Sequence, residues 1–204
     1  MSERKSGPGR VELIAAETGY KGRFEIRRYR LRHELYRGGM GPEITREVFE
    51  RGHAVAVLLH DPKADALVFV EQFRAGAYAA GIHPWLLETV AGIIDEGETA
   101  AEVAAREAKE ETGLEASDLF HVYDYLPSPG GCSETISFFA GRVDTTGMGG
   151  HAGLEEEHED IRVRAVPSDE ALAWLDRDEV RNAVTLVALH WFARNRDMLR
   201  RRWS

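Results

Sequence analysis

Cysteine is almost absent from this sequence, and long apolar runs are absent altogether. The single cysteine, Cys132, has no partner among the 204 residues, so an intrachain disulfide cannot form. This usage favours a reducing compartment, and the polar first ten residues hold no apolar run typical of a secretory signal. No stretch reaches the roughly 18 consecutive apolar residues that a membrane-spanning helix needs. We therefore expect a soluble, cytoplasmic protein without a membrane partner.

Positive charge is also scarce. The chain has 26 Lys and Arg residues against 35 Asp and Glu residues, a formal net charge of -9. Because nucleic-acid backbones are bound through clustered Lys and Arg, this balance disfavours a nucleic-acid partner. The acidic residues gather in residues 95–111 and 155–160. If the fold joins them they could hold divalent cations, although composition alone favours two solvated faces.

The patterning of apolar residues predicts an α/β protein with a substantial core, since 43% of the chain is hydrophobic. Predicted strands cover residues 24–32, 44–49, 53–59, 66–71, 85–90, 119–126, 135–143 and 161–166, and Gly92 is expected to end the strand at 85–90. Predicted helices cover residues 99–112, 169–175 and 179–200. Helices flanking a sheet indicate an α/β sandwich, with a small N-terminal β region over residues 1–50 and a second domain over 51–204.

The helix predicted at residues 99–112 carries the most specific chemical signal. Thr99 and Glu102 form a capping-box pattern at its start, and Gly113 stands where a left-handed C-terminal cap is expected. Along it Glu107, Glu110 and Glu111 have the spacing i, i+3 and i+4, which places three carboxylates on one face. Such like charges repel unless cations lie between them. The helix therefore predicts a Mg²⁺ site, with a solvated acidic face as the simpler alternative.

A longer pattern surrounds these glutamates. Gly92 is followed at fixed spacing by Glu98, Arg106 and Glu107, then by Glu110, Glu111, Gly113 and Leu114. This pattern resembles the Nudix box, and only Ala108 departs from it, where the family has a larger aliphatic residue. The resemblance implies a Nudix-type α/β/α sandwich with a metal-binding helix. Glu107 and Glu111 would bind Mg²⁺ or Mn²⁺, Glu110 would assist through water, and Glu98 and Arg106 would be mainly structural.

Outside the box, roughly residues 20–203 resemble the ADP-ribose pyrophosphatase branch of the superfamily. The segments that carry this likeness are Arg46-Glu47-Val48-Phe49-Glu50-Arg51-Gly52-His53, Glu71-Gln72-Phe73-Arg74, Trp85-Leu86-Leu87-Glu88, Ala91, Ser128-Pro129-Gly130-Gly131 with Ser133 and Glu134, and Glu157-His158-Glu159-Asp160-Ile161-Arg162.

Roles for several residues follow from that likeness. Ala91 would offer its backbone carbonyl to a metal, Glu159 would complete the metal cluster, and Glu157 would be the general base. Arg46 and Arg74 would clamp phosphate oxygens through their planar guanidinium groups, and Glu134 would contact the substrate. Solvated loop acids and surface ion pairs are the alternatives for these residues.

We expect hydrolysis of ADP-ribose to AMP and ribose 5-phosphate by metal-activated water. The family likeness further implies a homodimer in which the N-terminal strands cross to the partner. One alternative is a Nudix hydrolase of another nucleoside diphosphate sugar, such as GDP-mannose. Another is a sensor that binds ADP-ribose without cutting it.

Overall fold

The computed structural model describes residues 8–153 and 159–203. The chain divides into two compact units: residues 1–52 with 128–134, and residues 53–127 with 135–204. Within the described residues, none of the helices has the length and apolarity needed to cross a membrane.

The first unit is built on a three-stranded antiparallel sheet of β1 (Val11–Lys21), β2 (Glu25–His33) and β3 (Ile44–Glu50), in that order. The strands β2 and β3 match the predicted ranges closely. β1 was not predicted, because its apolar residues do not alternate regularly; the structure likewise shows register shifts between β1 and β2. The loop at residues 128–134 joins this unit through a bond from the Phe49 N–H to the Gly131 carbonyl, 2.8 Å.

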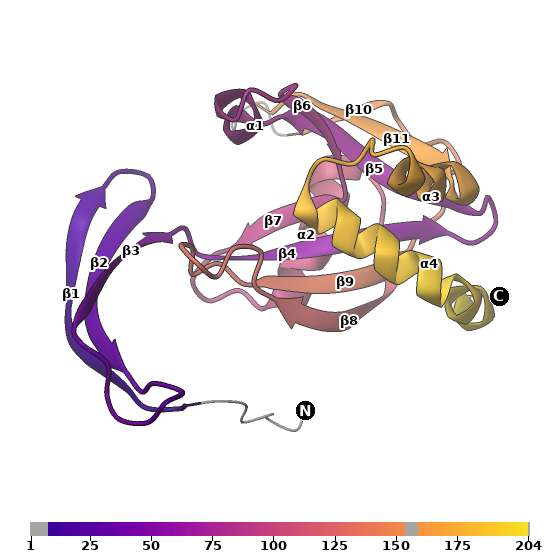
Figure 1. Ribbon diagram of the computed structural model, residues 1–204. Helices are drawn as coiled ribbons and strands as arrows, with labels where there is room; N and C mark the ends of the chain where they lie inside the picture. The colour runs from indigo at the N-terminus through magenta and orange to yellow at the C-terminus, as the bar shows by residue number, and fades with distance from the viewer. Residues whose placement is uncertain (1–7, 154–158, 204) are drawn as a thin grey trace. The chain divides into compact units, whose positions relative to one another are not determined.

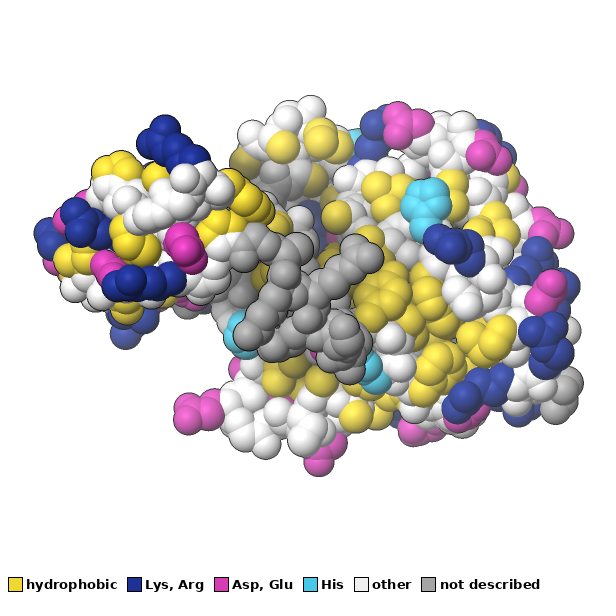
Figure 2. Space-filling view, turned by 60° about the horizontal axis from the view of Figure 1, so that its bottom comes forward, with side chains coloured by type: hydrophobic (Ala, Val, Ile, Leu, Met, Phe, Trp, Pro, Cys, Tyr) yellow, Lys and Arg dark blue, Asp and Glu magenta, His cyan; other side chains and the backbone are white. Residues whose placement is uncertain are grey.

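This sheet buries no apolar side chain of its own. Among the described residues of the whole first unit, only Gly41 and Glu134 are buried. Val11, Leu13 and Tyr20 of β1 are more than 60% exposed. Hydrophobic side chains are accordingly visible among the charged ones on this unit (Figure 2). The unit therefore lacks the core that normally stabilises a small sheet.

The second unit is built around an eight-stranded mixed sheet. Its strands are β4 (His53–Asp61), β5 (Ala66–Phe73), β6 (Trp85–Glu88), β7 (Val90–Ile94), β8 (Ser117–Tyr125), β9 (Ile136–Arg142), β10 (His151–Ala152) and β11 (Ile161–Pro167). The main order is β10-β11-β5-β4-β9-β8, with β6 paired to β5 and β7 paired to β4. Among the described strand pairs of this sheet, β4–β9 alone is parallel.

Helices cover both faces of this sheet (Figure 1). The helices are α1 (Ala75–Ala79), α2 (Ala100–Thr112), α3 (Ser168–Asp176) and α4 (Ala183–Trp203). Alternate residues of β4 point to opposite layers: Val55 and Val57 pack with α2, whereas Ala56 and Leu58 pack with α3 and α4. Burial on both faces explains why β4 is a continuous apolar run, and it confirms the predicted α/β sandwich.

Two predictions on the strand at residues 85–90 were wrong. The segment forms two strands, because β6 pairs with β5 whereas β7 pairs with β4, and the chain changes partner at Thr89. Gly92 does not end a strand: it lies in the middle of β7, opposite Val55. Which partner a strand takes is a tertiary property that the local pattern does not contain.

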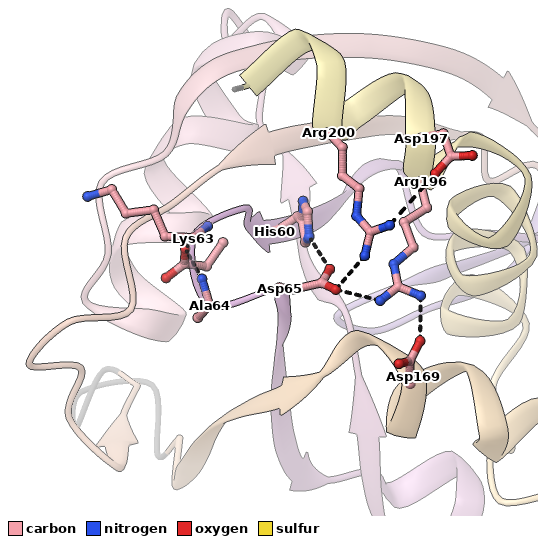
Figure 3. Close-up of polar contacts among 9 residues, drawn as sticks. His60, Lys63, Ala64, Asp65, Asp169, Arg196, Asp197 and Arg200 are labelled. Carbon is pink, nitrogen blue, oxygen red and sulfur yellow. Dashed lines mark hydrogen bonds and ion pairs between the residues drawn. The ribbon is translucent and has the colours of Figure 1, made fainter.

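The turn between β4 and β5 anchors α4 through a polar cluster, drawn in Figure 3. Arg196 and Arg200 both reach the Asp65 carboxylate, at 2.5 and 2.7 Å, and His60 lies 3.4 Å from it. Burial alone would raise the pKa of Asp65, but the hydrogen bonds from both arginines outweigh it and hold that pKa far below its usual range. The cluster therefore fixes α4 on the sheet.

Candidate active site

The position of α2 is set by local hydrogen bonds at both ends. The Thr99 side chain accepts from the Glu102 N–H and the Glu102 side chain accepts from the Thr99 N–H, as the capping-box pattern predicted. Gly113 closes the helix in the left-handed conformation, with φ 72° and a bond to the Lys109 carbonyl. Val103, Ala104 and Ala108 then pack beneath the sheet, and the carboxylates of Glu107 and Glu111 lie against β7.

Gly92 allows the close approach of α2 to β7. A Cβ atom at Gly92 would overlap the carboxylate and Cγ of Glu107, so any side chain there would displace that glutamate. The glycine of the predicted motif is thus required by the position of the Glu107 carboxylate rather than by a turn.

Glu111 is buried, with 4% of its surface exposed. It accepts from the Ala91 N–H at 3.2 Å and from the side-chain amide of Gln72 at 3.4 Å. Burial, followed by repulsion from Glu107, raises the pKa of Glu111 to about 8. Both hydrogen bonds come from neutral groups, and among the described residues no side-chain cation contacts this carboxyl group.

Glu107 shares that environment. Burial raises its pKa to about 7, repulsion from Glu110 and Glu159 adds to the effect, and attraction from Arg106 opposes it. Repulsion from Glu159 also contributes to raising the pKa of Glu111, after burial and repulsion from Glu107. The joining of the two acidic clusters into one cation site therefore stays a prediction, beside the alternative of two solvated faces.

Arg106 holds the surrounding acids in place. Its guanidinium group contacts both oxygens of Glu98 at 3.2 and 3.3 Å and also reaches Glu107 and Glu110, each at 2.9 Å. Arg106 thereby links α2 to Glu98, which lies before the helix.

The chemistry of these donors fits a divalent cation that prefers oxygen ligands. The carboxylates of the buried Glu111 and the half-buried Glu107 repel each other, and a cation between them would remove both the repulsion and the cost of burying charge. Within residues 8–153 and 159–203, however, no three His, Cys, Asp or Glu side chains already form a cluster that could hold an ion. Glu157, the predicted base, lies outside the described residues.

Arg74 stands on the same side of the sheet. It follows β5, its Nε donates to Glu88 at 2.7 Å, and its charge lowers the pKa of Glu111. Sequence reasoning did not single out Gln72 or Glu88 for a role. The only sequence signal was for Gln72: it lies two residues before Arg74, so strand alternation places both on one face.

Arg46 and Glu134 belong to the first unit. Arg46 lies on β3 and its guanidinium donates to the Thr45 carbonyl at 2.8 Å. Glu134 is buried and lies 3.4 Å from Arg51. Their predicted contacts with the substrate stay predictions, as does the metal contact of the Ala91 carbonyl.

Comparison with known proteins adds independent findings. A family model described as the NUDIX domain matches residues 50–189. The chain is 45% identical over 198 residues to the ADP-ribose pyrophosphatase of Escherichia coli strain K12, covering 97% of this chain and 95% of the relative. It is 39% identical over 197 residues to the Haemophilus influenzae protein of the same name, covering 95% and 91%.

More distant matches are also found. A GDP-mannose pyrophosphatase of Citrobacter koseri is 34% identical over 147 residues, covering 72% of this chain and 76% of that protein. A crystal structure of an ADP compounds hydrolase shares the fold with a TM-score of 0.69 at 21% identity, covering 92% of this chain and 97% of the other. With the box residues on α2 and a family model over more than half its length, the chain belongs to the Nudix family.

Proposed function

We propose that this protein hydrolyses the diphosphate bond of ADP-ribose, giving AMP and ribose 5-phosphate, with Mg²⁺ or Mn²⁺ as cofactor. The observation that carries the proposal is the buried Glu111 beside the half-buried Glu107, in a chain similar over nearly its whole length to ADP-ribose pyrophosphatases. We expect this protein to be located in the cytoplasm, where nucleotide metabolites occur.

Each part of the site has a chemical task in this proposal. Glu107, Glu111 and Glu159, with the Ala91 carbonyl, would hold the metal, and Glu110 would assist through water. When bound, divalent cations neutralise diphosphate oxygens and make water a stronger nucleophile near neutral pH. Glu157 would take the proton of the attacking water, which needs only modest basicity once the water is acidified.

The positive groups of the proposed site would bind the substrate. Arg74 and Arg46 would each present two parallel N–H groups to phosphate oxygens, and Glu134 would orient the rest of the molecule by accepting hydrogen bonds. Neither arginine carries out a proton transfer, because guanidinium groups stay charged at all relevant pH values.

The test is product analysis with purified protein and Mg²⁺ against ADP-ribose, GDP-mannose, diadenosine polyphosphates and NADH. We expect preferred turnover of ADP-ribose that a Glu111→Gln variant loses. Preferred turnover of GDP-mannose would keep the chemistry and replace the substrate, which the similarity to GDP-mannose pyrophosphatases makes the second candidate. Tight ADP-ribose binding without turnover would refute the enzyme and favour a sensor.

We further propose a homodimer formed through the N-terminal unit. Its support is that the three-stranded sheet buries no apolar side chain among its described residues and leaves Val11, Leu13 and Tyr20 open to solvent. A sheet of this kind normally needs a partner surface. Sedimentation should give twice the chain mass, and a Leu13→Asp variant should shift it toward monomer. A wild-type monomer that keeps full activity would refute this proposal.

A further inference from the structure

We infer that Glu88 is a positioning residue that aims the guanidinium group of Arg74 at the substrate diphosphate. The inference rests on the proposed function, in which Arg74 binds that diphosphate. It assigns a role to a half-buried acid that is neither a proposed metal ligand nor a proposed base.

The strand register places Glu88 and Arg74 on the face that α2 covers. Glu88 of β6 lies directly opposite Val70 of β5, and Val70 packs in the apolar cluster beneath α2. Directly opposed residues of antiparallel strands share a face, so Glu88 points to the α2 side. Its neighbour Leu87 points the other way and packs in the cluster with α3 and α4.

Because alternate residues of a strand point to the same face, Gln72 and Arg74 lie on the same face as Val70. Gln72 lies two residues beyond Val70 and donates to Glu111, so this face of β5 meets the metal helix. The backbone of Arg74 is still extended, with φ -124° and ψ 108°, which keeps its side chain on that face. Both main chain and side chain are tied to one short segment, because the Arg74 N–H also donates to the Pro84 carbonyl at 2.7 Å.

The contact uses one particular nitrogen of the guanidinium group. Nε of Arg74 donates to Glu88 at 2.7 Å, a charge-assisted hydrogen bond, while no described residue accepts from either terminal nitrogen. The two terminal nitrogens therefore remain as a pair for two oxygens of a phosphate. Glu88 has 13% of its side chain exposed and Arg74 has 41%, so the acid is the fixed partner and the arginine is open to a ligand.

Glu88 thus prepares Arg74 before the substrate arrives. An arginine side chain has several rotatable bonds, and ordering it when the ligand binds costs conformational entropy. Because Glu88 already holds Arg74 in one geometry, substrate binding no longer includes that cost. We expect a Glu88→Ala variant to raise KM for ADP-ribose roughly 3- to 10-fold with kcat nearly unchanged, because no metal ligand is altered. A Glu88→Gln variant keeps an acceptor for Nε and should recover most of the affinity.

The deciding experiment is a double-mutant cycle of Glu88→Ala and Arg74→Ala, assayed for kcat and KM with ADP-ribose and Mg²⁺. If Glu88 acts through Arg74, removing it from the Arg74→Ala variant has no further effect on KM. Additive effects of the two substitutions, or an unchanged KM in Glu88→Ala, would overturn the inference while leaving the proposed activity intact. A wild-type protein that does not hydrolyse ADP-ribose would overturn both.

Two controls separate positioning from loss of structure. Glu179→Ala removes a comparable bridge, from the Nε of Arg177 to Glu179 at 2.8 Å, on an exposed part of the chain, and should leave both constants unchanged. Thermal unfolding of each variant identifies a folding defect. If Glu88→Ala fails to fold, the Glu88→Gln variant decides: near-wild-type KM supports the inference, and a KM as high as that of Arg74→Ala overturns it.

Discussion

Replacing Glu111 by Gln should stabilise the metal-free protein while abolishing metal-dependent activity. Glutamine has nearly the same shape, and its side-chain carbonyl can still accept from the Ala91 N–H. It removes a titratable group whose charged form is disfavoured by burial and by the nearby Glu107. The ionised carboxylate is costly in the absence of a cation, so the residue proposed to bind the metal lowers the stability of the fold.

The magnitude follows from the pKa of Glu111, which burial and the charge of Glu107 raise from 4.5 to about 8. Above pH 4.5 the unfolded chain releases this proton and the folded protein keeps it, so stability falls as pH rises toward 8. At pH 7 the penalty amounts to at most roughly 3 kcal/mol. Below pH 4.5 both states are protonated, and the advantage of glutamine disappears.

The assay is urea unfolding of both proteins in EDTA at several pH values and again with saturating Mg²⁺. We expect the variant to be more stable at pH 7, to lose that advantage by pH 4.5, and to gain little from Mg²⁺, which should stabilise the wild type. Glu115→Gln, at a position with 82% of its side chain exposed, is the control and should change stability by only a few tenths of a kcal/mol. A variant no more stable than wild type at pH 7 in EDTA would refute the reasoning.

Three further changes test other parts of the structure. Gly92→Ala should abolish metal-dependent turnover in a folded protein, because the new Cβ displaces Glu107; isothermal titration with Mn²⁺ should show weakened binding. Asp65→Asn is compatible with the positive φ of 49° at this position, and it should lower the free energy of unfolding by about 1–2 kcal/mol because the contact with Arg196 is weakened. Since the folded pKa of Asp65 is lowered, the stability advantage of the wild type should disappear as pH falls below 3.8, which acid titration of unfolding would measure. Thr99→Ala should lower stability by about 1 kcal/mol in urea unfolding, with little effect on KM.

The sequence by itself determined α2 and its carboxylates. Its caps at Thr99 and Gly113 act through hydrogen bonds between residues at most four positions apart, so the pattern contains the whole cause. The predicted start of α4 at residue 179 was wrong, since the helix begins at Ala183. A local signal for the true start was present in the sequence but was missed: the Asn182 side chain caps the helix by accepting from the Thr185 N–H at 2.8 Å.

Tertiary structure alone decided the surroundings of those carboxylates. The division of residues 85–94 between two partner strands, the hydrogen bond from Gln72 to Glu111, and the bridge from Glu88 to Arg74 all join segments that are separate in the sequence. Local patterns specify which face of a strand a residue occupies, but not which strand lies beside it. The sequence therefore named the candidate acids of α2, and only strand pairing in the sheet determined which strand residues donate hydrogen bonds to Glu111.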